Sequence, residues 1–127
     1  MAKPLGAIIA HHVIVPSAGR IIIEGDGILP ILRISSDFHR TNQTQNKKVV
    51  RSVFIIEPNE DKIFQNLCAR KRGFETSSQA AQRAFARASW LFGKWLEEEA
   101  KSSGLPTVKA RPYDSLADRI LETVESL

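Results

Sequence analysis

The sequence predicts an α/β fold with a parallel sheet. Three short runs rich in β-branched residues are typical of strands and cover residues 20–26, 49–56 and 105–110. Longer segments between and after them carry apolar residues at helical spacing, with capping residues at their starts. Because strands that alternate with helices favour parallel crossover connections, we expect the 127 residues to form one α/β domain.

The first third of the chain predicts a helix, a strand and a loop. Apolar residues spaced for one helix face cover residues 5–15, and Pro16 to Gly19 end that pattern. The isoleucine run of residues 20–26 predicts a strand buried on both faces, with a tight glycine turn at its carboxyl end. Residues 28–32 predict the start of a short helix. Residues 33–48 are polar and predict a surface loop.

The middle of the chain predicts a strand and a capped helix. The run of residues 49–56 is a second candidate for a buried strand, and Pro58 ends it. Asn59 is suited to capping the helix that follows, which we expect to end near Gly73. The apolar positions of this helix are Ile63, Phe64, Leu67 and Cys68.

A long helix and a last strand–helix pair complete the chain. Ser77 or Ser78 is expected to cap the long helix, and Gly104 to terminate it after about Ser103. Its predicted packing stripe consists of Phe85, Ala88, Leu91, Phe92, Trp95 and Leu96. A final helix follows Tyr113 to Ser115, and its predicted inward residues are Leu116, Ile120, Leu121 and Val124.

Composition limits the classes of partner and of compartment. The net charge of +4 and the pI of about 9.5 favour anionic partners such as phosphates, nucleotides or nucleic acid. The 14 acidic residues interleave with 18 basic ones, so the basic density is below that of a dedicated nucleic-acid binder. A single cysteine excludes an internal disulfide framework, and no apolar run approaches a membrane span. We therefore expect a cytoplasmic protein.

Asp26 is the first candidate for chemistry, because it follows the first predicted strand between two glycines. Ligands of open α/β sheets bind at the carboxyl ends of strands. An acid in that place can hold Mg²⁺ through water or accept a proton from a substrate hydroxyl. The alternative is a plain strand-to-loop turn in which Asp26 caps the next segment. The histidines have no supporting carboxylate pattern, so we expect no protein-held metal centre.

A basic cluster is the second candidate. It consists of Arg70, Lys71 and Arg72, together with Arg83 and Arg87, which are four residues apart on one helix face. Arginine forks match phosphate oxygens and could clamp a phosphoryl group during its transfer. The alternative is a solvated helix end and helix face.

The third candidate is the turn after the last strand. Arg111 or Tyr113 could stack on a nucleotide base there, with Pro112 between them. The alternative is a simple strand-to-helix turn. A phosphate-binding loop of the form Gly-x-x-x-x-Gly-Lys-[Ser/Thr] does not occur in the sequence, since the only Gly-Lys pair is followed by Trp95.

In order and spacing, four segments resemble a bacterial group of P-loop kinase-like ATPases, near the gluconate, shikimate and 2-phosphoglycerate kinases. They are Ile8 to His12; Ile22 to Pro30; Phe54 to Pro58 with Arg70 to Phe74; and Ala86 to Leu96, continuing to Pro112. The resemblance covers nearly the whole chain except the loop at 33–48. It implies a three-layer fold in which residues 20–26, 49–56 and 107–111 match the third, fourth and fifth strands.

The resemblance also implies roles for particular residues. Arg70 and Arg72 would open a lid that spans about residues 70–90, and Arg83 and Arg87 would face the phosphates from the lid helix. Arg111 and Pro112 would lie near the adenine of ATP, and Asp26 would orient the substrate hydroxyl or Mg²⁺. Family members place the P-loop strand in the middle of a sheet of order 2-3-1-4-5. Because this sequence has no such segment, the resemblance implies an incomplete sheet with sticky strand edges.

Three functions follow as expectations. The first is part of an ATP-dependent small-molecule kinase, with little activity from this chain alone because the P-loop lysine and backbone cradle are missing. The second is a non-catalytic remnant or subunit that acts by protein interaction, with a second copy in a homo-oligomer or a partner chain covering the strand edges. The third, a basic nucleic-acid-binding module, is weakened because the arginines gather in one lid-like segment.

Overall fold

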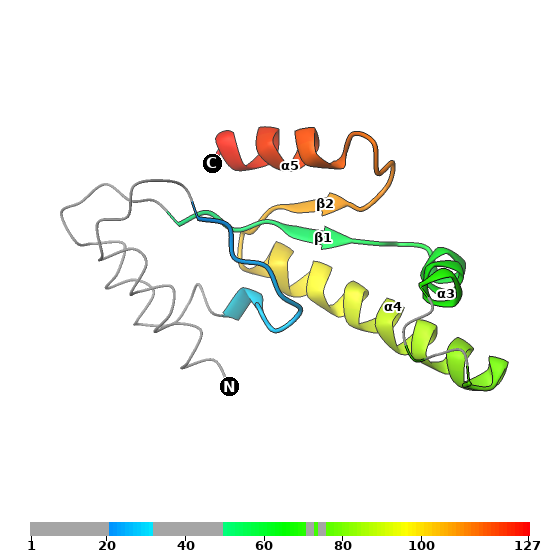
Figure 1. The fold of residues 1–127 in the computed structure, drawn as a ribbon. Coiled ribbons are helices and arrows are strands. Elements are labelled where there is room, and N and C mark those ends of the chain that lie inside the picture. Colours follow the sequence, from blue (N-terminus) through cyan, green and yellow to red (C-terminus); the bar gives the residue numbers. More distant parts are fainter. Residues whose placement is uncertain (1–20, 32–49, 71–72, 74–75) are drawn as a thin grey trace. The chain divides into compact units, whose positions relative to one another are not determined.

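The computed structural model describes residues 21–31, 50–70, 73 and 76–127, and the chain divides into two compact units, Met1–Ser52 and Val53–Leu127. The helices and strands of the described residues all belong to the second unit (Figure 1). They are β1 (Phe54–Ile56), α3 (Glu60–Ala69), α4 (Gln79–Ser102), β2 (Thr107–Lys109) and α5 (Leu116–Glu125). The helix expected over residues 5–15 and the loop expected over 33–48 lie outside the described residues.

β1 and β2 form a parallel pair, as their alternation with helices predicts. Ile55 lies opposite Val108 in the register. The Phe54 N–H donates to the Pro106 carbonyl at 3.1 Å, and the Ala110 N–H donates to the Ile56 carbonyl at 2.8 Å. Both strands are shorter than the sequence predicts: residues 50–53 and 105–106 run irregularly into strands of three residues each.

The unit from Val53 to Leu127 has three layers, with α4 on one face of the strand pair and α5 on the other (Figure 1). The fold is therefore α/β. Its core lies between the strands and α4, where Phe54, Ile56, Ala100 and Leu105 are buried and Leu96 packs against them. Ala86 and Ala100 are fully buried on α4, because a methyl side chain lets a helix approach its neighbours closely.

The predicted helix starts are confirmed. The Asn59 side chain accepts from the Lys62 N–H at 3.0 Å, and the Ser78 hydroxyl accepts from the Ala81 N–H at 3.2 Å. Gly104 follows α4 with a φ of 64°, a conformation that glycine adopts without steric cost. α3 ends at Ala69, earlier than predicted, although Gly73 does adopt a left-handed φ of 79°.

The strand predicted over residues 20–26 is wrong for its described part. Residues 21–25 have no strand pairing, and a turn follows in which the Ile28 N–H donates to the Gly25 carbonyl at 3.3 Å. Ile22 is 91% exposed rather than buried on both faces. A β-branched run becomes a strand only where a neighbouring strand satisfies its backbone groups, and the ladder of the described residues joins β1 to β2 alone. Of the helix predicted from residue 28, the described part contains a 3₁₀ turn at Pro30 and Ile31.

Two predictions of burial are also wrong. Ile55 is 48% exposed, so β1 buries one face instead of two. The predicted stripe of α4 is largely exposed, with Phe85, Leu91, Phe92 and Trp95 each between 42% and 49%, and Leu121 of α5 is 53% exposed. The spacing identified residues that share a helix face. Of that stripe, Leu96 packs against the core as predicted, and Ala100, which lies outside the stripe, is buried beside it.

None of the helices in the described ranges is long and apolar enough to cross a membrane.

Candidate functional site

Polar side chains meet at the carboxyl ends of the two parallel strands. Glu57 comes directly after β1, and Arg111 comes two residues after β2. The Arg111 Nε donates to Glu57 Oε2 at 2.8 Å, and the glutamate side chain is only 13% exposed. Parallel strands bring these two residues together although they are 54 positions apart in the sequence. The ion pair therefore lies at the edge of the sheet where α/β proteins bind ligands.

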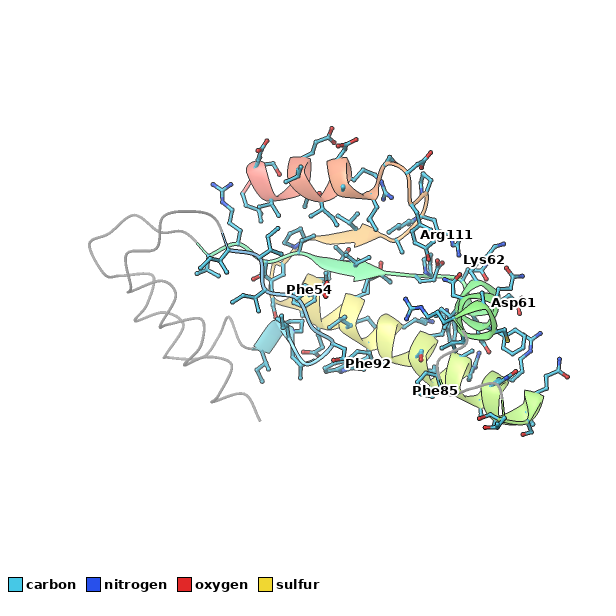
Figure 2. The ribbon with its side chains drawn as sticks, viewed as in Figure 1. Phe54, Asp61, Lys62, Phe85, Phe92 and Arg111 are labelled. Carbon is cyan, nitrogen blue, oxygen red and sulfur yellow. The ribbon has the colours of Figure 1, made fainter. Side chains whose placement is uncertain are left out.

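α3 contributes a third member, Asn66, to this cluster. The second arginine nitrogen, Nη2 of Arg111, donates to Asn66 Oδ1 at 3.3 Å. The Asn66 amide in turn donates to the Tyr113 hydroxyl at 2.9 Å. The guanidinium carbon of Arg111 lies 4.6 Å from the centre of the Tyr113 ring. Arg111, Asn66 and Tyr113 therefore each contact the other two. Figure 2 shows Arg111 beside α3, at the carboxyl end of the strands.

Arg119 of α5 holds the loop that carries Arg111 and Tyr113. Its two terminal nitrogens donate to the Lys109 carbonyl at 2.6 Å and to the Pro112 carbonyl at 2.7 Å. Its Nε donates to the Ser115 hydroxyl at 3.3 Å. The Arg111–Pro112 peptide bond inside this loop is cis. Charged donors on three loop acceptors reduce the freedom of the loop, so the site is largely formed without a ligand.

An open hollow of about 340 Å³ lies beside the cluster and is lined by Asn66, Ala69, Arg70 and Tyr113. Its volume is at the lower end of the range for small-molecule sites. Arg70 is exposed at the carboxyl end of α3, and Tyr113 is 53% exposed. A planar ring can lie on the exposed part of the Tyr113 ring while an anionic group pairs with Arg70.

Arg83 and Arg87, the predicted phosphate clamp, pair with carboxylates of α3. Arg83 donates to Asp61 and Arg87 to Glu60, each at 2.7 Å. The Arg83 guanidinium also lies 3.8 Å from the centre of the Phe64 ring. These contacts join α4 to the first turn of α3, so both arginines have a structural role here. The two side chains are 51% and 56% exposed, which leaves them accessible from solvent.

Trp90 belongs to the same helix contact. Its indole N–H donates to the Pro58 carbonyl at 2.9 Å, which fixes the segment between β1 and α3. The guanidinium of Arg87 and the ammonium of Lys94 lie 4.6 Å and 4.8 Å from its ring. Trp90, which is not a member of the predicted packing stripe, therefore belongs to the contact between α4 and the segment before α3.

The remaining predicted residues lie in the other unit or outside the described residues. Asp26 is an exposed turn residue of the Met1–Ser52 unit. Arg72 lies outside the described residues. Within the described part of the chain, no three His, Cys, Asp or Glu side chains come together as metal ligands. Of the six predicted site residues that the structure describes, Arg70, Arg111 and Pro112 fall at the hollow or its supporting loop.

Glu57 and Asn66 were not among the predicted site residues. Glu57 has a sequence signal, because it is an acid directly after a predicted strand. Asn66 has none, since a polar residue in a half-buried helix is usually a solvent contact. Its role depends on how α3 lies against the loop after β2.

Comparisons of the chain with protein-family models, with curated proteins and with solved structures gave no match. The kinase resemblance therefore rests on the sequence segments alone, and it enters below as a proposal.

Proposed function

We propose that this chain is a nucleotide-binding part of an ATP-dependent small-molecule kinase and that it binds the adenine end of ATP at the hollow beside Tyr113. The observation that carries the proposal is the cluster of Glu57, Arg111, Asn66 and Tyr113 at the carboxyl ends of parallel strands. A preformed aromatic surface beside an exposed cation suits a base joined to phosphates.

The bonds inside the cluster leave capacity for a ligand. The side chain of Asn66 uses one amide hydrogen in its bond to Tyr113 and one oxygen lone pair in its bond from Arg111, so one donor and one acceptor position remain. These are the groups that a purine edge requires. Arg111 donates to Glu57 and Asn66 and lies over the Tyr113 ring, so in this proposal it supports the aromatic surface rather than contacting the phosphates. Arg70 is the cation at the hollow itself.

The side chains at the hollow fit the adenine end of ATP better than its triphosphate. Tyr113, Asn66 and Arg70 suit a base and one anionic group. A triphosphate with Mg²⁺ also needs the phosphate cradle and lysine of a P-loop, which the sequence lacks. In the proposed enzyme Asp26 orients the acceptor hydroxyl or the metal, and Arg83 and Arg87 stabilise charge on the transferred group. We therefore expect nucleotide binding from this chain and little phosphoryl transfer.

Calorimetry with ATP and Mg²⁺ tests the proposal. The wild-type chain is expected to bind ATP, and Tyr113→Ala should weaken binding by about tenfold, since base stacking on an aromatic ring contributes roughly 1–3 kcal/mol. Tyr113→Phe is the matched control, because it keeps the ring and removes only the hydroxyl. It should retain most of the affinity.

Inorganic tripolyphosphate separates base recognition from attraction to positive charge. Its binding should be unaffected by Tyr113→Ala and weakened by Arg70→Ala. If the wild-type chain gives no heat with ATP, the proposed function is wrong. If ATP and tripolyphosphate respond equally to Tyr113→Ala, the base does not bind at the tyrosine.

A non-catalytic role in protein interaction is the second candidate. It is supported by the exposed apolar side chains of α4 and by the free outer edge of the short β1–β2 pair within the described residues. Nucleic-acid binding is less favoured, because the 18 basic residues interleave with 14 acidic ones and the basic density is therefore low.

A further inference from the structure

Arg119 of α5 binds both ends of the short segment that carries Arg111. One terminal nitrogen donates to the Lys109 carbonyl at 2.6 Å, and the other donates to the Pro112 carbonyl at 2.7 Å. The segment between these carbonyls therefore curves around one guanidinium group. A planar arginine fork holds two acceptors in a fixed relation to each other. A single side chain of α5 thus sets the shape of the segment from residue 109 to residue 112.

The direction of the Arg119 side chain follows from the start of α5. Arg119 comes four residues after Ser115, the residue before the helix, so the two share one helix face. The Arg119 Nε donates to the Ser115 hydroxyl at 3.3 Å, which directs the guanidinium toward the preceding loop. Pro112 has no N–H, so its carbonyl is its one backbone hydrogen-bonding group, and Arg119 occupies it.

The bonds of Arg119 lie between two backbone anchors of the loop. The Ala110 N–H donates to the end of β1 at 2.8 Å, and the Tyr113 carbonyl accepts from the first N–H of α5 at 3.2 Å. The interval between these anchors carries the side chain of Arg111, which lies over the Tyr113 ring. Arg119 therefore constrains the part of the loop from which both site residues project.

Arg119 differs in its partners from the other arginine of this loop. Arg111 forms an ion pair with Glu57. Arg119 donates to two carbonyls and a hydroxyl, and among the described residues it pairs with no carboxylate. It is also not one of the side chains that line the hollow. Its contacts are those of a residue that holds the loop and does not meet the ligand.

We propose that Arg119 is the positioning residue of the nucleotide site. By holding the Lys109 and Pro112 carbonyls it places Arg111 and the Tyr113 ring, and it thereby determines the affinity for a base that it does not touch. This role rests on the proposed function, because the base is the group that the ring receives. The contacts through which Arg119 acts are formed without a ligand, so its effect on the ring is also measurable without a nucleotide.

A double-substitution cycle, measured by calorimetry with ATP, tests whether Arg119 acts through Tyr113. Arg119→Ala should weaken ATP binding by up to the roughly tenfold expected for Tyr113→Ala, because a displaced ring stacks poorly on the base. The double variant should bind ATP no more weakly than Tyr113→Ala alone, since the second substitution has nothing left to displace. Losses that multiply would mean that the two residues act separately, and they would overturn the proposal.

Ile120→Ala separates positioning from general stability. Ile120 is the next residue of α5 and is half-buried, so its truncation weakens the helix packing without removing a bond to the loop. It should lower the melting temperature and leave the ATP affinity unchanged. An Ile120→Ala chain that loses as much affinity as Arg119→Ala would overturn the positioning role.

Arg119→Lys is the milder variant, for use where Arg119→Ala is unfolded. An ammonium group keeps the charge but does not reproduce the planar fork that holds two carbonyls. Arg119→Lys should therefore weaken ATP binding several-fold, and full affinity in this variant would contradict the proposal.

Nuclear magnetic resonance of Tyr113, the one tyrosine of the chain, tests the same role without a nucleotide. Its ring signals should shift in ligand-free Arg119→Lys and stay in place in Ile120→Ala. If the wild-type chain gives no heat with ATP, the proposed function fails, while this comparison still decides whether Arg119 positions the ring. Unchanged Tyr113 signals in the Arg119 variants overturn the inference.

Discussion

At the residue scale, Glu57 joins three parts of the candidate site. Its Oε2 accepts from Arg111, and its Oε1 accepts from the Asn59 backbone N–H at 3.2 Å. The first bond ties β1 to the loop after β2, and the second fixes the residue that caps α3. Both carboxylate oxygens are therefore used by donors of this chain. Because Glu57 holds Arg111 in place, Arg111 in turn fixes the positions of Asn66 and the Tyr113 ring.

Glu57→Gln is expected to destabilise the fold by about 1–2 kcal/mol. An amide offers one acceptor oxygen where the carboxylate offers two, so one of the two donors loses its partner. Asp61→Asn is the matched control, because Asp61 is 74% exposed and its pair with Arg83 contributes less than about 1 kcal/mol. Urea denaturation followed by circular dichroism measures both changes. Equal effects of the two substitutions would argue against a special role for Glu57.

At the element scale, α4 determines much of the geometry. Its amino half pairs with α3 through Arg83 and Arg87, and its carboxyl half packs under the strands through Leu96 and Ala100. Gly93 lies between these two regions. A Cβ built at Gly93 meets nothing within 4 Å, so the position does not need glycine for space.

Alanine substitutions at Gly93, within α4, and at Gly104, just after it, should change the stability of the protein in opposite directions. Gly93→Ala should stabilise the protein by up to about 1 kcal/mol, because alanine has the higher helix propensity and there is room for its methyl group. Gly104→Ala should destabilise it by roughly 1–2 kcal/mol, because Gly104 has a φ of 64° after α4. Thermal melting of the two variants beside the wild type measures both effects. A stabilising Gly104→Ala would contradict the assigned helix end.

At the scale of the whole molecule, the unit from Val53 to Leu127 depends on a small core. Its buried apolar residues are Phe54, Ile56, Ala86, Ala100, Leu105, Val108 and Ala110. Three of the seven are alanines, which contribute little buried area. The aromatic ring of Phe54, 7% exposed, therefore supplies a large part of the apolar burial.

Phe54→Ala should destabilise the fold by about 3–5 kcal/mol, because it removes the ring and leaves a cavity between β1 and α4. Such a loss is a large fraction of the stability of a domain this small. Ile55→Ala, on the neighbouring residue, is the control and should cost much less, since Ile55 is 48% exposed. Denaturant midpoints of the two variants decide the comparison. A larger effect at Ile55 would mean that the outer face of β1 is covered in solution.

The sequence by itself was sufficient for features that depend on a few neighbouring residues. Asn59 and Ser78 start their helices because a short polar side chain next to a helical run satisfies the first free N–H groups. Gly104 ends α4 because only glycine adopts the required φ without strain. The alternation of strands and helices was likewise sufficient to predict that β1 and β2 are parallel.

Only the tertiary structure decided which surfaces meet. Helical spacing groups Phe85, Phe92 and Trp95 on one face, but burial depends on which face the sheet contacts, and here Leu96 and Ala100 make that contact. A strand is a property of two segments, so the isoleucines of residues 21–23 have the composition of a strand without its pairing. The candidate site likewise depends on segments that meet only in the folded chain. Glu57, Asn66 and Arg111 come from three elements, and the parallel pairing of β1 and β2 with the position of α3 brings them within bonding distance.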